Sequence, residues 1–167
     1  MEFQRLLREH ERILFKIAYG YCRNPGERQD LIQEICLQLW KGFPRYDAAR
    51  PFPTWMFRIG LNVAISFKRK TYTRKAGVIS DLEFIAAKES PVEIELERNE
   101  QLERLNSMIH QLDELNRALL ILYLEDHSTR EISEILGISE TNVTTKIHRL
   151  KSYLRSQMES NKTPRGE

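Results

Sequence analysis

The sequence contains no long apolar run. Across its 167 residues, no stretch approaches the roughly 18 consecutive apolar residues that a membrane-spanning helix needs. Its N-terminus, MEFQRLLREHER, is charged and has no apolar segment of the kind found in secretory signals. We therefore expect a cytoplasmic protein with no membrane insertion.

Cysteines and catalytic motifs are also scarce. The two cysteines, Cys22 and Cys36, form no C-x-x-C motif, so we expect core thiols rather than a zinc or redox site. There is no phosphate-binding G-x-x-x-x-G-K-[ST] loop, no Asp/Glu/His cluster suited to two metal ions and no Ser/His/Asp arrangement. The four histidines are scattered along the chain: His10, His110, His127 and His148. The sequence therefore predicts no enzymatic activity, no metal and no cofactor.

Apolar residues recur at helical spacing almost throughout, which predicts an all-α protein. The formal net charge of +2 is small, but basic and acidic residues are segregated. We expect two small helical domains, 1–72 and 95–157, joined by an acidic linker at 73–94 and followed by a disordered tail at 158–167. The periodicity predicts helices at about 2–22, 27–42, 54–70, 92–112 and 115–124, and two more between 128 and 157.

The stretch from Ser128 to Ser152 has the pattern of a helix-turn-helix. Ser128 and Glu131 form an S-x-x-E capping box that begins the first helix. Gly137 stands where a left-handed residue ends a helix, and Ser139 is suited to cap the next one. The second helix repeats apolar residues with a helical period: Val143, Ile147, Leu150 and Leu154.

The other faces of that second helix carry short polar and basic side chains: Thr141, Asn142, Thr144, Thr145, His148, Arg149 and Ser152. Such a surface suits the major groove of DNA. Glu140 is the only carboxylate between Ser139 and Ser156, which favours contact with phosphates. The alternative is an ordinary two-helix corner whose polar face is solvated.

The segment 41–75 combines cations with aromatic rings. Its ionised residues are Lys41, Arg45, Arg50, Arg58, Lys68, Arg69, Lys70, Arg74 and Lys75, against Asp47 alone. The interleaved rings are Tyr46, Phe52, Trp55, Phe57, Phe67 and Tyr72. Single-stranded nucleic acid is bound by this combination, because cations follow the phosphates and rings stack on unpaired bases. The alternative is that the rings belong to the core and the cations are solvated.

Two other segments stand out. The helix predicted at 27–42 is apolar more than halfway round, because Ile32, Leu37 and Trp40 lie outside its inner stripe. Such a helix either packs on two sides or offers an apolar patch to a partner. From Asp81 to Glu103 carboxylates predominate, so this segment is expected to avoid DNA phosphates, to mimic nucleic acid in a basic channel, or to act only as a soluble tether.

Two segments, in this order, resemble a known family. DLIQEICLQLWKGFPRY followed by FPTWMFRIGLNVAISFKRK resembles region 2 of bacterial sigma factors of the sigma-70 family. LDELNRALLILYLEDHSTREISEILGISETNVTTKIHRLKSYLR resembles their region 4, and the short linker resembles the extracytoplasmic-function (ECF) group. The resemblance implies an RNA polymerase sigma factor that binds core polymerase, recognises the −35 and −10 promoter elements and promotes DNA melting.

The resemblance also implies partners and site residues. The β′ clamp helices of core polymerase would contact Asp30, Gln33, Glu34, Leu37 and Trp40. The −10 element, with a base extruded into the loop at 45–52, would be held by Arg45, Tyr46, Phe52, Trp55, Arg58, Asn62, Lys68 and Arg69. The −35 element would be read by Thr141, Asn142, Thr144, Thr145, His148 and Arg149. The β flap of polymerase and an anti-sigma protein are further implied partners.

The sequence departs from the family in three places. Leu115–Ala118 stands where the family commonly has Pro-x-x-x-Arg, and Thr144 and Thr145 stand where many relatives have a basic residue. The loop with Pro44 and Pro51 differs from the common Phe-Arg-Gly type. We therefore expect weak binding to duplex DNA in the absence of polymerase, and the −10 specificity does not carry over from the family.

A free-standing helix-turn-helix regulator with an N-terminal effector domain is the alternative function. Such a regulator has no need of the apolar surface predicted on 27–42. The near-neutral charge also allows the hypothesis that the two domains pack together in the free protein and cover their DNA faces.

Overall fold

The computed structural model describes residues 1–75 and 100–160, and within these ranges all regular structure is helical. The all-α class is confirmed. None of the described helices is long and apolar enough to cross a membrane. The elements are α1 (Glu2–Glu9), α2 (Arg12–Tyr21), α3 (Pro25–Gly42), the 3₁₀ helix η1 (Phe43–Arg45), α4 (Phe52–Lys75), α6 (Glu100–Gln111), α7 (Glu114–Leu124), α8 (Thr129–Leu136) and α9 (Glu140–Ser160).

The single helix predicted at 2–22 is wrong, because the chain turns at 10–11 and forms α1 and α2 instead. The turn lets each piece bury its own apolar stripe in a different place. Phe3 of α1 packs its ring against those of Trp40 and Phe43 at the far end of α3. Helix α2 packs along α3 and α4 and buries Ile17 completely.

The starts of α3 and α4 follow from their first residues. The Asn24 side chain accepts the N–H groups of Gly26 and Glu27, which caps α3. Helix α4 begins at Phe52 and ends at Lys75, so it starts two residues before and ends five residues after the helix predicted at about 54–70. The Pro51 carbonyl accepts the Trp55 N–H at 3.2 Å and so begins the helical hydrogen bonding ahead of Thr54.

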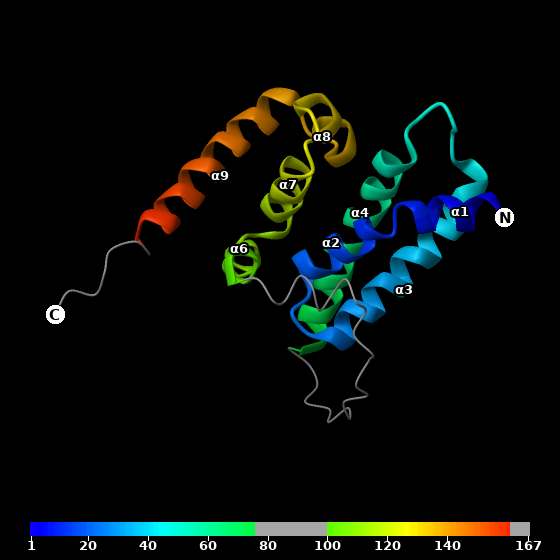
Figure 1. Cartoon of the computed structure of the whole chain (residues 1–167), viewed down its shortest axis with the longest axis horizontal. Helices are drawn as coiled ribbons and strands as arrows, with labels where there is room; N and C mark the ends of the chain where they lie inside the picture. The colour runs from blue at the N-terminus through cyan, green and yellow to red at the C-terminus, as the bar shows by residue number, and fades with distance from the viewer. Residues whose placement is uncertain (76–99, 161–167) are drawn as a thin grey trace.

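The described helices form two bundles that touch. Helices α2, α3 and α4 pack on one another, as do α7, α8 and α9. Between the bundles, α2 contacts α6 and α7, and α4 contacts α7 and α8, as Figure 1 shows. Buried apolar residues of both bundles belong to one continuous core. The arrangement agrees with the hypothesis that the two halves pack together in the free protein. The expectation that this covers the DNA face of the helix-turn-helix is wrong, because all six predicted −35 residues on α9 are exposed.

Three predictions concern the ends and the cysteines. Most of the predicted linker at 73–94 lies outside the described residues, as do 161–167 of the predicted tail. The tail does not begin at 158, because α9 continues to Ser160. Both cysteines are free thiols, Cys22 buried and Cys36 half-buried, and burial raises the pKa of Cys22 to about 11.

Candidate polymerase and nucleic-acid interfaces

The helix-turn-helix has the geometry that its sequence predicts. The Ser128 Oγ accepts the Glu131 N–H at 3.1 Å, and the Glu131 carboxylate accepts the Ser128 N–H at 2.8 Å. That backbone hydrogen bond is the main cause of a lowered pKa for the Glu131 carboxyl. Gly137 ends α8 with a φ of +70°, a conformation that glycine adopts without steric cost. The Ser139 Oγ accepts the Asn142 N–H at 3.1 Å and so caps α9.

Helix α9 presents an open polar face. Val143 and Leu150 are buried against α7 and α8, and Ile147 and Leu154 are half-buried beside them. The residues predicted to read the −35 element are all exposed: Thr141, Asn142, Thr144, Thr145, His148 and Arg149. Thr144 donates its hydroxyl to the Glu140 carbonyl at 3.0 Å. The structure thus brings all six onto one accessible helix.

The loop before α4 is built on a cluster of aromatic rings. The ring of Tyr46 lies 4.9 Å from that of Trp55 and stacks on Phe43 at 5.8 Å. The Tyr46 hydroxyl donates to the Arg50 carbonyl at 2.6 Å, which ties the loop across its base. Tyr46 and Trp55 are half-buried and each keeps part of its ring accessible to a ligand.

Phe52 differs from the other predicted −10 residues. Its side chain is only 4% exposed, and its ring is surrounded by the rings of His10, Tyr46 and Trp55. No face of Phe52 is open to an unpaired base in this structure. Phe52 is therefore not expected to stack on DNA. It instead supports the accessible rings of Tyr46 and Trp55.

The polar residues of α4 lie on one side of the helix. Arg58, Asn62 and Arg69 are exposed and fall within about 40° of one another at ~100° per residue. Arg45 is exposed on η1. Lys68 is half-buried, and its ammonium lies 3.6 Å from the Glu27 carboxylate of α3. Lys68 was expected to bind DNA phosphates. In this structure its ammonium is instead paired with the Glu27 carboxylate.

Helix α3 exposes the apolar surface that its sequence predicts. Leu37 is 44% and Trp40 is 50% exposed, on the side of α3 away from its buried stripe. Asp30 and Gln33 are exposed on the same side, and the half-buried Glu34 accepts a hydrogen bond from Gln38 at 2.9 Å. The five predicted docking residues follow the i, i+3, i+4, i+7 spacing of one helix face.

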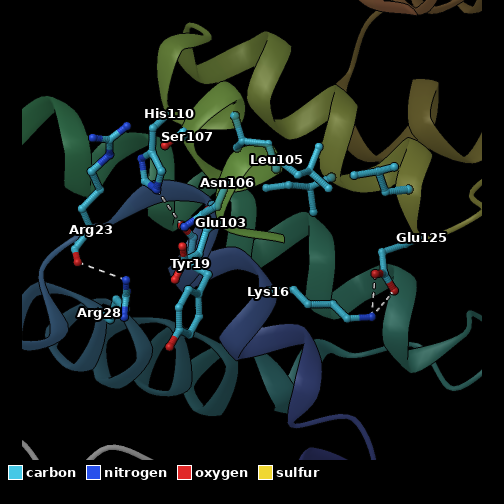
Figure 2. A pocket seen from close by; sticks show the side chains of 14 residues that line it. Lys16, Tyr19, Arg23, Arg28, Glu103, Leu105, Asn106, Ser107, His110 and Glu125 are labelled. Atoms are coloured by element: carbon cyan, nitrogen blue, oxygen red, sulfur yellow. Dashed lines mark hydrogen bonds and ion pairs between the residues drawn. The ribbon is translucent and has the colours of Figure 1, made fainter. Parts of the chain in front are cut away.

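Sequence reasoning missed the polar contacts that join α2 to α6 and α7, and α7 to α6. One of them, between His110 and Tyr19, borders a cavity of about 540 Å³ (Figure 2). His110 Nε2 bonds to the Tyr19 carbonyl at 2.9 Å, and the Tyr21 hydroxyl donates to the Glu114 carbonyl at 2.8 Å. Arg117 donates to the carbonyls of Ile109, His110 and Leu112. The one available signal was Arg117 itself, a lone cation within the apolar run of α7.

Burial, and secondly the nearby Arg117 cation, lower the pKa of His110 to about 4. Between pH 4 and the ordinary value near 6.5, the unfolded chain binds more protons at this site, so the free energy of unfolding falls as the pH falls. From pH 7.5 to pH 5 we expect a loss of about 1 kcal/mol after allowing for solvent screening, roughly 2–4 °C in Tm. Thermal unfolding should show this loss in the wild type and a smaller one in His110→Gln. An equal loss in both proteins would contradict it.

The comparisons with known proteins cover both bundles. Residues 6–74 match the family model of sigma-70 region 2, and residues 102–154 match that of sigma-70 region 4. The chain belongs to the sigma-70 family. The two matches span most of the chain and occur in the predicted order, so the free-standing regulator is not favoured. The protein is an RNA polymerase sigma factor of the ECF group, and its family comprises sigma factors, which are not enzymes.

Several curated relatives and solved structures are similar to this sigma factor. The ECF RNA polymerase sigma factor SigW of Bacillus subtilis is 26% identical over 161 residues, covering 87% of this chain and 82% of SigW. SigL of Mycobacterium tuberculosis is 28% identical over 145 residues, covering 84% of this chain and 79% of SigL. CnrH, solved in complex with the cytosolic domain of CnrY, matches with a TM-score of 0.67 at 23% identity, covering 95% of this chain and 88% of CnrH. RpoE of Bartonella quintana, solved with the anti-sigma factor NepR, matches with a TM-score of 0.69 at 17% identity, covering 95% and 97% of the two chains.

Proposed function

We propose that this sigma factor divides its work among three surfaces. The exposed apolar face of α3 binds core polymerase, the loop at 45–51 with α4 holds the unpaired −10 strand, and α9 reads the −35 duplex. The observation that carries the proposal is the uniformly accessible polar face of α9 on a helix-turn-helix. The predicted domains, 1–72 and 95–157, are extended to the ends of their last helices, Lys75 of α4 and Ser160 of α9.

The case for polymerase binding rests on the exposure of two large apolar side chains. Leu37 and Trp40 lie side by side on α3, at i and i+3, and each keeps nearly half of its surface in water. Tryptophan is enriched at the energetic centres of protein interfaces because a buried ring removes a large apolar area from water. Asp30 and Gln33 supply polar neighbours that fix the docking orientation.

The case for −10 binding rests on two accessible rings beside exposed cations. Tyr46 and Trp55 offer stacking surfaces, and Phe52 holds them in place from below. Arg45 and Arg58 are exposed close to these rings in the sequence, and Arg69 is exposed on the same side of α4 about three turns beyond Arg58. We propose that these cations neutralise phosphates along the strand. Extruding a base into the loop costs the free energy of its pairing and stacking in the duplex. The contacts with these rings and cations offset that cost.

The case for −35 binding rests on chemistry suited to base edges. Arg149 offers a bidentate donor for guanine, and Asn142 offers the same geometry for adenine. The threonine methyl groups suit the thymine methyl. Because α9 carries few basic residues on this face, phosphate attraction alone gives weak binding, and attachment to polymerase supplies the rest.

Partners beyond core polymerase and promoter DNA are proposed from the relatives. CnrH was solved with the cytosolic domain of CnrY, and RpoE with the anti-sigma factor NepR. We propose an anti-sigma protein for this chain as well, and contact of its second domain with the β flap of polymerase. Since the polymerase acts in the cytoplasm, we place the protein there.

Run-off transcription tests the function directly. Core RNA polymerase from the source bacterium is given pooled genomic DNA fragments, with and without this protein. We expect discrete new transcripts whose upstream regions share two motifs. Stable binding to duplex DNA without polymerase, and no new transcripts with it, would instead support a free-standing regulator.

A further inference from the structure

Gly42, the last residue of α3, has a backbone conformation that any residue can adopt. Its φ of −81° and ψ of −21° are those of a right-handed helix, and the chain continues through it into η1. Glycine is a poor helix former, and its usual role at a helix end is as a left-handed residue, which Gly42 is not. The absence of a side chain at this position therefore has its explanation in packing.

The space that Gly42 leaves is filled by two side chains of α4. A Cβ at position 42 would lie 3.3 Å from Cζ2 of the Trp55 ring and 3.4 Å from Cδ1 of Ile59. Carbon atoms in contact prefer a separation of about 3.5–4.0 Å. The outer edge of the Trp55 indole therefore lies closer to the last turn of α3 than a side chain there would permit.

Three aromatic rings also surround the Trp55 ring. Measured between ring centroids, Tyr46 lies 4.9 Å from it, Phe52 5.4 Å and Phe43 6.4 Å. Phe52 is buried in the core and cannot move aside without disturbing it. Trp55 itself is half-buried, so its ring moves outward, toward water, more easily than it moves toward these neighbours.

Hydrogen bonds hold the loop and the helix start on which these rings are carried. The Trp55 N–H donates to the Pro51 carbonyl at 3.2 Å in the first turn of α4. The Tyr46 hydroxyl donates to the Arg50 carbonyl at 2.6 Å, which ties Tyr46 to the loop. Because Tyr46 is tied in this way, an outward shift of the Trp55 side chain changes the placement of the two rings relative to each other.

We infer that Gly42 is a positioning residue for capture of the −10 strand. By lacking a side chain, it lets the Trp55 ring lie at the depth where this ring and that of Tyr46 together receive an unpaired base. The inference rests on the proposed function, in which these two rings are the accessible stacking surfaces. Gly42 acts through Trp55 and not by touching DNA.

Two substitutions of Gly42 give a graded test. Gly42→Ala places a methyl group against the Trp55 ring, and Gly42→Val adds two further methyl groups to the same carbon. Alanine and valine are both better helix formers than glycine, so neither substitution should reduce the helix content. Circular dichroism of the full chain checks that both variants are folded.

Tryptophan fluorescence measures the placement of the ring without DNA or polymerase. Trp40 is replaced by phenylalanine for this measurement, because the chain has two tryptophans and Trp55 then emits alone. We expect Gly42→Ala to shift the Trp55 emission to longer wavelength and to increase its quenching by acrylamide, since the ring moves into water. Gly42→Val should do so more strongly. Unchanged emission and quenching in both variants would overturn the inference.

Promoter opening by the holoenzyme is the second readout, with Trp40 in place. Permanganate probes the unpaired strand of a promoter recovered by run-off transcription. Complete loss of one stacked base weakens binding by roughly 5- to 150-fold, and a displaced ring keeps part of that contact. We therefore expect opening to fall about threefold in Gly42→Ala and about tenfold in Gly42→Val. Binding to core polymerase and protection at −35 should stay at the wild-type level.

Trp55→Phe supplies the matched background. Phenylalanine lacks the outer indole edge that meets position 42, so adding Gly42→Ala to Trp55→Phe should cause no further loss of opening. An equal loss in both backgrounds would show that Gly42 acts on the fold in general, which would overturn the inference.

Trp55→Ala tests the proposed function separately. If this variant opened promoters as well as the wild type does, the assignment of Trp55 to the −10 strand would fail, and the inference would fail with it. The fluorescence shift would distinguish that outcome from a failure of positioning alone, because it reports the place of the ring whether or not the ring binds DNA.

Discussion

Trp40→Ala is expected to weaken binding to core RNA polymerase by about 30-fold, which corresponds to roughly 2 kcal/mol for a tryptophan at the centre of an interface. Trp40 is half exposed on α3 with Leu37 beside it. Removing the ring leaves a hollow in the apolar surface that polymerase is proposed to cover. Fluorescence anisotropy of labelled protein titrated with core polymerase measures the change in Kd.

The Trp40 ring also packs edge-on against Phe3, so part of any effect could arise from folding. Such an aromatic contact contributes about 1 kcal/mol, which the first bundle should tolerate. Phe3→Leu is the matched control, because it removes the same ring contact and leaves the surface of α3 intact. Equal loss of polymerase binding in Phe3→Leu and Trp40→Ala would show that packing, not the exposed surface, is responsible.

Thr145→Ala with Arg149→Ala is expected to reduce −35 recognition by roughly 10- to 100-fold, because a good bidentate contact discriminates by about 1–3 kcal/mol. Both side chains are exposed and neither packs in the core, so the fold should be unaffected. Footprinting of the holoenzyme should show lost protection at −35, while polymerase binding by the double variant stays at the wild-type level.

Arg155→Ala controls for charge in that experiment. Arg155 is exposed on the same helix, about two turns beyond His148, and its loss removes one positive charge while all six predicted −35 residues stay in place. It should weaken binding evenly across DNA sequences and lessen the salt dependence. Full −35 protection by the double variant would show that another surface reads the element.

Local chemistry explains why the helix-turn-helix was predicted in detail. The Ser128 and Glu131 pair, the left-handed Gly137 and the Ser139 cap each act within a few residues of chain, so their geometry follows from sequence alone. Helical periodicity also placed Leu37 and Trp40 away from the inner stripe of α3. It left open whether they pack on a second side or stay exposed, and the structure shows that they are exposed.

Features that depend on distant contacts were predicted less well. No intrinsic propensity of the residues marks the turn between α1 and α2. The turn is favoured instead by distant contacts, because it lets Phe3 pack against Trp40 and Phe43 at the end of α3. Phe52 has the same aromatic chemistry as Tyr46 and Trp55, and only the packing of three rings around it decides that it is buried. Composition cannot distinguish a buried ring from an accessible one.

The helical class, the helix-turn-helix, the family and the candidate surfaces follow from periodicity, capping and short motifs, and all of these can be recognised in the sequence. The ion pair between Lys68 and Glu27, and the contact of α2 with α6 and α7 through Tyr19, Tyr21 and Gly20, became known only from the fold. These contacts join residues about 40 to 100 positions apart. Their partners are fixed by how the two bundles pack and not by any local pattern.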